Sequence, residues 1–515
     1  MRRVPAQSLW VVMLTALMTA PAAAAQVGAS ELATATDDSE GDWDDDGGDW
    51  DDEGFADMPL KATPSTAAAA TTTSPWTAAG FARSDWALWT ERLSDNPFAK
   101  GRQSVDLKLE FKQGIWRATV ATHVDRDLAY DHERSGYDMP TLRAYESLFQ
   151  LRDAFVAAAL GDLEFTLGRQ IVAWGEGDAI SPLDVVNPRD LREPGLSDLD
   201  DIRIPVLASR AGWFRGAHRV EAMVVHEASF GLRGPPRGPF SPLPWLIHNS
   251  PALGTFQKAL PHIPIAERFD AIPLDWEHKQ ERWSADLQQA YLRWVHKGEG
   301  LDLGLYVASV LDQQGVMTVS EAQNGLMMDA IINNKPEPLT LTLDHRRYEV
   351  VGTSGATTWS DLLVKWELVY NIRHPYNAGD FPQVYVIRSD VVSGMLGLTW
   401  RGVDDTTIAV EASKNYLLDK PDALLFPIDA PVLMLRVMHQ SMREDLTLLL
   451  AASAMGLQAE YGWLLRAEAN YKMVEAVKLA VGYVTYQPTD EFGPFAGLNS
   501  HDRLFMRLRW DFAAR

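Results

Sequence analysis

The chain has 515 residues, a formal net charge of −23 and no cysteine. The lack of cysteine excludes disulfide bonds and a lipid-modified cysteine anchor, and the twelve histidines stand singly, without metal-ligand spacing. After Ala25, no stretch is apolar for long enough to predict a transmembrane helix. We therefore expect no metal, no cofactor, no enzymatic activity and no nucleic-acid partner.

The segment 1–25 has the pattern of a secretory signal peptide. Arg2 and Arg3 precede an apolar run over 9–18, and Ala23 to Ala25 offer a small-residue cleavage site. The sequence therefore predicts an exported protein that is cleaved near Ala25.

An acidic segment follows the predicted signal peptide. Residues 37–57 hold twelve Asp or Glu and no Lys or Arg, a composition that cannot bury enough apolar surface to fold. Residues 58–74 are rich in Ala, Thr, Ser and Pro, which is typical of a linker. We expect a disordered tail and linker over 26–79, followed by one large domain over 80–515.

The end of the chain alternates strictly between apolar and charged residues. One face carries Leu504, Met506, Leu508, Trp510 and Phe512, and the other carries Arg503, Phe505, Arg507, Arg509 and Asp511. This period of two predicts a strand with an apolar face and a charged face. Such a strand suits a barrel that contacts lipid outside and water inside, so we expect Trp510 and Phe512 to be needed for membrane assembly.

The same alternation recurs through the large domain and predicts an all-β transmembrane barrel of about eighteen antiparallel strands. Short turns and long loops alternate, which places every short turn on the periplasmic side and the long loops outside. The predicted strands are 81–93, 102–112, 115–124, 149–160, 162–174, 207–214, 217–226, 285–296, 301–312, 338–352, 359–370, 390–401, 405–416, 430–441, 445–454, 458–470, 474–486 and 501–512.

The charged faces of these strands would line the lumen. These charges either pair with one another along a solvated wall or form a selectivity lining. The candidate lining residues are Arg293, Lys365, Glu367, Arg436, Arg503, Arg507 and Arg509.

The most distinctive segment runs from Gly168 to Asp190 and reads GRQIVAWGEGDAISPLDVVNPRD. A strand that ends in G-R-Q-x-x-x-W-G-E, followed by a loop with N-P-x-D, resembles a family of Gram-negative outer-membrane barrels of unassigned function. The resemblance covers about Gly80 to Phe512. It implies an outer-membrane location and a partnership with a periplasmic or inner-membrane exporter of hydrophobic molecules. Strand parity points Arg169 outward, so we expect it at the barrel rim or after a bulge.

The loop that follows this strand is expected to fold inward and constrict the lumen. The alternative is a loop packed by its own side chains for stability, and no accompanying cluster supports a catalytic role. The candidate constriction residues are Trp174, Glu176, Asp178, Asp184, Arg189 and Asp190.

The long connection over 227–284 is unusually apolar for an outside loop. It holds Phe240, Trp245 and Phe256, and its second half has helical spacing. Exposed apolar side chains on this scale require burial or a ligand. The connection is either a lid over the barrel mouth or a contact surface for a hydrophobic molecule.

These features together predict an outer-membrane barrel that transports a hydrophobic or amphipathic molecule through a loop-gated lumen. The alternatives are a constricted porin for small polar solutes and a barrel that only displays loops. The expected partners are outer-membrane lipid and the barrel assembly machinery.

Overall fold

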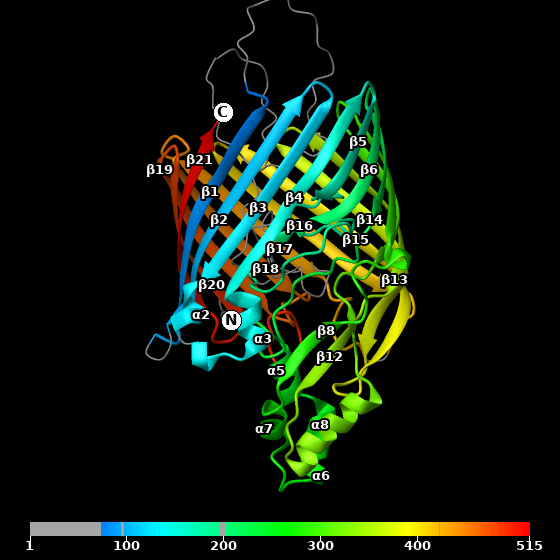
Figure 1. The fold of residues 1–515 in the computed structure, drawn as a ribbon, viewed down its shortest axis with the longest axis vertical. Coiled ribbons are helices and arrows are strands. Elements are labelled where there is room, and N and C mark those ends of the chain that lie inside the picture. Colours follow the sequence, from blue (N-terminus) through cyan, green and yellow to red (C-terminus); the bar gives the residue numbers. More distant parts are fainter. Residues whose placement is uncertain (1–73, 94–96, 133, 196–201, 422, 515) are drawn as a thin grey trace, which may run out of the picture.

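The structure is a computed structural model that describes residues 74–93, 97–132, 134–195, 202–421 and 423–514. Eighteen antiparallel strands form a closed barrel, because β1 pairs with β2 on one side and with β21 on the other (Figure 1). The barrel strands are β1 (Trp76–Trp89), β2 (Phe98–Gln113), β3 (Trp116–Asp127), β4 (Ser147–Leu160), β5 (Leu163–Gln170), β6 (Val206–Arg215), β7 (His218–Val225), β9 (Gln289–Lys297), β10 (Asp302–Leu311), β13 (Arg347–Trp359), β14 (Leu362–Ala378), β15 (Tyr385–Val403), β16 (Thr406–Leu417), β17 (Val432–Ser441), β18 (Leu446–Met455), β19 (Trp463–Val474), β20 (Val477–Gln487) and β21 (Arg503–Ala514). The predicted barrel and its strand number are confirmed.

The wall separates apolar from charged residues as the sequence predicts. On β21, Leu504 is 48% exposed on the outer surface, whereas Arg503 is 1% exposed and faces the lumen. Leucines and aromatic rings on neighbouring strands extend this exposed apolar surface around the barrel. A contiguous apolar band of this kind fits a wall that contacts lipid.

The connections alternate between short turns at one end of the barrel and long loops at the other. Gly114 and Gly161 form two of the short turns with φ of 61° and 62°, a backbone region that glycine enters without steric cost. We call this end, where β1 starts and β21 finishes, the turn end and the opposite end the loop end (Figure 1).

At the loop end, two long connections pack together into a small capping subdomain (Figure 1). Its three-stranded sheet places β12 between β8, its parallel neighbour, and β11, its antiparallel neighbour. The subdomain elements are α5 (Leu243–His248), α6 (Pro251–Ala259), α7 (Ile265–Asp270), β8 (Leu274–His278), β11 (Val316–Thr318), α8 (Glu321–Asn333) and β12 (Leu339–Asp344). Buried side chains from both connections, including Phe269 and Leu341, share one apolar core.

Helix α8 begins at a well-defined N-terminal cap. A reciprocal capping box starts the helix, because Ser320 accepts from the backbone N–H of Gln323 at 3.2 Å and Gln323 accepts from that of Ser320 at 2.6 Å. Short helices also occupy other connections: α2 (Leu128–His132), η2 (Arg134–Gly136), α3 (Met139–Tyr145) and η3 (Ala285–Leu287).

Some predicted boundaries are wrong. The predicted strand 338–352 is two strands, because the chain leaves β12 in the capping subdomain and enters β13 of the barrel. The predicted strand 162–174 ends at Gln170, where the chain turns into the lumen. Strand β1 begins at Trp76, earlier than the predicted 81–93.

No helix in the described part of the chain is long and apolar enough to cross a membrane. The predicted signal peptide and acidic segment lie outside the described residues.

A lumen loop between two cavities

The connection between β5 and β6 folds into the barrel. We call its described residues, 171–195 and 202–205, the lumen loop. It forms hydrogen bonds with strands far away around the barrel, so it crosses the lumen instead of extending outward.

Glu367, a lumen-facing residue of β14, fixes the first part of the loop. Its carboxylate accepts hydrogen bonds from the backbone N–H groups of Glu176, Gly177 and Leu183 at 2.7, 2.9 and 3.0 Å. The Ser181 hydroxyl donates to the same carboxylate at 2.9 Å. These four donors replace part of the water that burial removes from the carboxylate.

Glu411 of β16 holds the adjacent turn in the same way. Its carboxylate accepts from the backbone N–H groups of Asp178, Ala179 and Ile180 at 2.6, 2.9 and 2.8 Å. Lys365 of β14 adds an ion pair to the Asp178 side chain at 2.6 Å. Three strand residues therefore fix six consecutive positions of the loop, 176–181, and also Leu183.

Glycine is required where the loop approaches the wall. Gly175 has a φ of 92°, and a Cβ there would overlap the Ser181 hydroxyl. A Cβ on Gly177 would overlap the carbonyl of Ile180. The tight turn therefore depends on both glycines.

The far part of the loop is held on the opposite side of the ring of strands. Glu193 pairs with Lys100 of β2 at 2.8 Å and also with Arg102. The next carbonyl, that of Pro194, accepts from Arg503 of β21 at 3.0 Å. The loop therefore joins β14 and β16 to β2 and β21.

Trp174 wedges the beginning of the loop against the barrel wall. The indole is only 2% exposed, and its ring centroid lies 5.3 Å from those of Tyr291 and Tyr306. The Arg293 guanidinium lies 5.9 Å from the Trp174 ring and pairs with Glu221 at 3.1 Å. Trp174 therefore packs the loop, as the stability interpretation of this segment requires.

Three of the other candidate constriction residues, Asp184, Arg189 and Asp190, form ion pairs within the loop, and Glu176 contacts a strand. Asp184 pairs with Arg189 at 2.6 Å and with Arg203 at 3.3 Å. Asp190 pairs with Arg192 at 2.6 Å. Glu176 accepts from the Ser354 hydroxyl of β13 at 3.2 Å.

The remaining candidate lining residues lie on the lumen face of their strands. Arg507 pairs with Asp85 at 2.8 Å, and Arg509 pairs with Asp511 at 2.6 Å. Arg436 of β17 is half-buried and pairs in register with Ala409 of β16. It therefore lies on the same face as Glu411, which is two residues further along β16. The predicted lining residues thus line one continuous inner wall but do not converge on one point.

Arg169 lies at the rim, as its parity requires. It pairs with the buried Glu227 at 2.7 Å and donates to the carbonyl of Pro205 at 2.6 Å. At the far edge of the barrel, Trp510 is exposed on the outer face, and its ring centroid lies 5.5 Å from that of Phe512.

The three candidate residues of the apolar connection separate in space. Phe240 lies in the mouth of the barrel, 5.8 Å from the Trp89 ring. Trp245 stacks on Phe492 at 5.6 Å, and Phe256 is 39% exposed on α6. They therefore do not form one hydrophobic contact surface. Most of the other apolar side chains of this connection are buried in the subdomain core.

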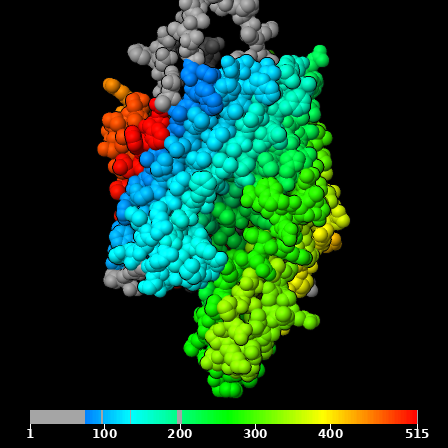
Figure 2. Space-filling model, viewed as in Figure 1, coloured from blue at the N-terminus to red at the C-terminus, as the bar shows by residue number. Residues whose placement is uncertain are grey.

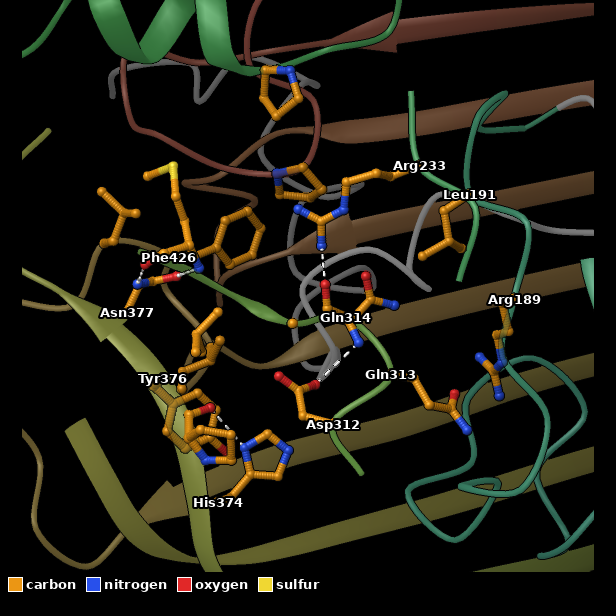
Figure 3. Close-up of a pocket in the computed structure, with 18 of the residues that line it drawn as sticks. Arg189, Leu191, Arg233, Asp312, Gln313, Gln314, His374, Tyr376, Asn377 and Phe426 are labelled. Carbon is orange, nitrogen blue, oxygen red and sulfur yellow. Dashed lines mark hydrogen bonds between the residues drawn. The ribbon is translucent and has the colours of Figure 1, made fainter. Parts of the chain in front are cut away.

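Two cavities flank the lumen loop. The larger, which we call the vestibule, has a volume of about 400 Å³ and lies between the loop and the capping subdomain (Figure 3). The smaller, of about 140 Å³, lies toward the turn end and is lined by Glu176, Arg219, Arg293 and Lys297. Ser181 lines the first cavity and Gly175 the second, so a few loop residues separate them. In the space-filling view, the capping subdomain projects below the barrel, beyond the wall that surrounds the loop (Figure 2).

The vestibule contains charged residues that the sequence did not single out. Arg233 lies in the first long connection and Asp312 begins the second, directly after β10, and strand alternation does not mark them as neighbours. Burial raises the pKa of Asp312 to about 6 and lowers the pKa of the Arg233 guanidinium. Among the described residues, no group of three or more His, Cys, Asp or Glu could hold a metal ion.

Comparison with known proteins identifies a family. A family profile described as a protein of unknown function, DUF1302, matches residues 6–475. A comparison with curated proteins gave no significant match.

Among solved structures, the fold resembles outer-membrane barrels of Acinetobacter and Pseudomonas. OccAB3 of Acinetobacter baumannii is 10% identical, with 85% of this chain and 99% of that chain covered and a TM-score of 0.45. The outer membrane protein OpdK of Pseudomonas aeruginosa is 9% identical, with 85% and 99% covered and a TM-score of 0.44. OccK2 of Pseudomonas aeruginosa, solved in complex with glucuronate, is 10% identical, with 85% and 97% covered and a TM-score of 0.44. Because the DUF1302 profile spans most of its length, the chain belongs to the DUF1302 family.

Proposed function

We propose that this protein is an outer-membrane channel that lets small polar or amphipathic solutes cross a lumen constricted by the lumen loop. One observation carries the proposal. The loop is fixed across a closed, charge-lined barrel by Glu367 and Glu411, with a cavity on each side of it. A barrel that served only to display loops would have no need of an internal constriction anchored in this way.

The location rests on two independent features. The outer face of the barrel is apolar, and the segment 1–25 has the pattern of a secretory signal peptide. An exported barrel of this kind belongs in the outer membrane of a Gram-negative bacterium, with outer-membrane lipid and the barrel assembly machinery as partners. The predicted association with a hydrophobe exporter stays a prediction, since no contact surface on the described part of the barrel supports it.

The structure removes the main argument for a purely hydrophobic cargo. That argument depended on the apolar residues of the long connection, and most of them pack into the core of the capping subdomain. The lumen around the loop is instead lined by charged and hydrogen-bonding groups. The porin alternative is therefore the function that the geometry supports best.

Single-channel recording in planar lipid bilayers tests the proposal. We expect purified protein to give small, discrete conductance steps that grow when the loop anchors are loosened. Protein that inserts as an assembled barrel yet gives no conductance, with intact or loosened anchors, would favour the display alternative.

A further inference from the structure

The vestibule contains a guanidinium without a direct counterion. Arg233 donates one hydrogen bond to the carbonyl of Gln314 (Figure 3). Its guanidinium lies 5.4 Å from the Trp276 ring. No carboxylate of the described residues forms an ion pair with it. Taking a cation partly out of water without a partner costs free energy, which an incoming anion would offset.

The acidic groups nearby are already engaged. Asp312 lines the same cavity, but its carboxylate accepts from the backbone N–H of Gln314 at 3.1 Å. Asp184 is shared by Arg189 and Arg203. Of the carboxylates that line the cavity, Asp184 is thus held by arginines of the lumen loop, and Asp312 acts on Arg233 only from a distance, without a direct ion pair.

Part of the vestibule wall is apolar, beside polar side chains such as Gln313, His374 and Asn377. Figure 3 shows Phe426 and Tyr376 on one side of the cavity and Arg189 on the other, with Arg233 and Asp312 between them. Phe240, Leu243 and Leu246 add apolar surface from the capping subdomain. Apolar walls with a few placed polar groups are typical of sites for small organic molecules, and about 400 Å³ is near the small end of such sites.

We propose that the vestibule binds small organic anions that carry an oxyanion head on an apolar or aromatic body. The head would lie beside Arg233 and form the direct ion pair that this guanidinium lacks. The body would lie against Phe426 and the neighbouring apolar wall. The inference rests on the proposed channel function, for which it names the solute class.

Four probes with the same ring but different heads test the proposal: benzoate, benzenesulfonate, benzyl alcohol and benzylammonium. Binding to the full chain in detergent is measured by calorimetry and by the fluorescence of its tryptophans. We expect both anions to bind about tenfold more tightly than the alcohol, and the cation to bind most weakly. Equal or tighter binding of benzyl alcohol or benzylammonium would overturn the proposal, as would the absence of saturable binding of any probe.

Variants locate the charge. Arg233→Gln should weaken benzenesulfonate binding about tenfold and leave benzyl alcohol binding unchanged, while Arg233→Lys should retain part of the affinity. Arg143→Gln is the matched control, since its side chain is 63% exposed on α3 and does not line the vestibule. If Arg233→Gln binds the anion as tightly as the unaltered protein, the assignment is wrong. If Arg233→Gln does not fold, binding of the four probes to the unaltered protein still tests the proposal.

Binding and conductance separate the two proposals. If the protein conducts but binds no anion, the binding-site proposal is wrong and the channel proposal stands. If it binds anions but never conducts, the channel proposal is wrong and the binding-site proposal stands.

Discussion

Glu411 Oε1 lies 2.6 Å from the backbone nitrogen of Asp178, although 233 residues separate them along the chain. The contact joins a barrel strand to the lumen loop through a carboxylate and a run of backbone N–H groups. These donors could not pair with a strand or helix, because the loop has neither, and buried unpaired N–H groups are costly. Glu367 and Glu411 thus replace secondary structure as the partners of this segment.

Loosening both anchors should widen the channel. The double variant Glu367→Gln, Glu411→Gln exchanges a carboxylate oxygen for an NH₂ group at each site, which places donor against donor. Hydrogen bonds to charged groups contribute about 1.5–3 kcal/mol each, so the loop should detach for part of the time. We expect single-channel conductance to rise about twofold or more, with added current noise.

The control for this pair is Glu164→Gln. Glu164 also faces the lumen, but it pairs with Arg117 at 3.5 Å and makes no contact with the lumen loop. Its conductance should match that of the unaltered protein. Equal effects from Glu164→Gln and the double variant would show that lumen charge, and not loop attachment, sets the conductance.

Glycine substitution tests the same turn sterically. Gly177→Ala puts a Cβ against the carbonyl of Ile180 and should shift the loop at a cost of about 1–3 kcal/mol. Gly254→Ala is the control, because a Cβ at this position of α6 meets nothing within 4 Å and should stabilise the helix by up to about 1 kcal/mol. We expect altered current noise for Gly177→Ala alone. If the current trace of Gly177→Ala is unchanged, the turn at Gly177 is not rigid.

The barrel was predictable because its wall obeys a simple period. Alternation along each strand gave the strand number and the inner faces, including those of Lys365, Glu367 and Arg507. The same signal failed at 338–352, where alternation continues across a break. Strand β12 lies outside the barrel because it pairs with β8, which belongs to the other long connection. This pairing is a tertiary interaction, which alternation along the chain does not reveal.

The site was predictable only in part. The G-R-Q segment indicated an inward loop, but the groups that Glu367 and Glu411 bind are backbone N–H groups, which leave no signature in the sequence. Arg233 and Asp312 come together because two long connections fold over the mouth of the barrel. The alternation along the chain does not mark Arg233 and Asp312 as neighbours, because their proximity depends on how the two connections fold together.

Anion binding in the vestibule should depend on pH through Asp312. Burial raises the pKa of Asp312 to about 6, so its negative charge appears as the pH rises through 6 and opposes an anionic ligand. Around it, the pKa of His345 is lowered to about 3 and that of Asp344 is lowered too, while Arg233 stays charged, so these three do not titrate between pH 5 and 8.

Benzenesulfonate remains an anion throughout this range, so we expect its affinity to fall as the pH rises from 5 to 8. Calorimetry at several pH values measures the effect. Asp312→Asn should bind with nearly constant affinity across the range. If Asp312→Asn keeps the full pH dependence, a group other than Asp312 causes it.

The last strand should decide assembly. Strand β21 pairs with both β20 and β1, so deleting 503–512 removes the pairing that closes the barrel. Phe512→Asp keeps the backbone but places a charge beside Trp510, near the lipid-facing edge, at a depth-dependent cost of up to about 2–4 kcal/mol. Asp511→Asn is the matched control, since this neighbour points to the lumen side and pairs with Arg509.

Assembly can be measured on a detergent gel. A closed sheet has no free edges and resists unfolding, so the unheated barrel should migrate faster than the boiled chain. We expect the fast band to disappear for the deletion, to weaken for Phe512→Asp and to persist for Asp511→Asn. A full fast band for the deletion would mean that β1 and β20 can close the barrel without β21, which contradicts the pairing of β21 with both strands.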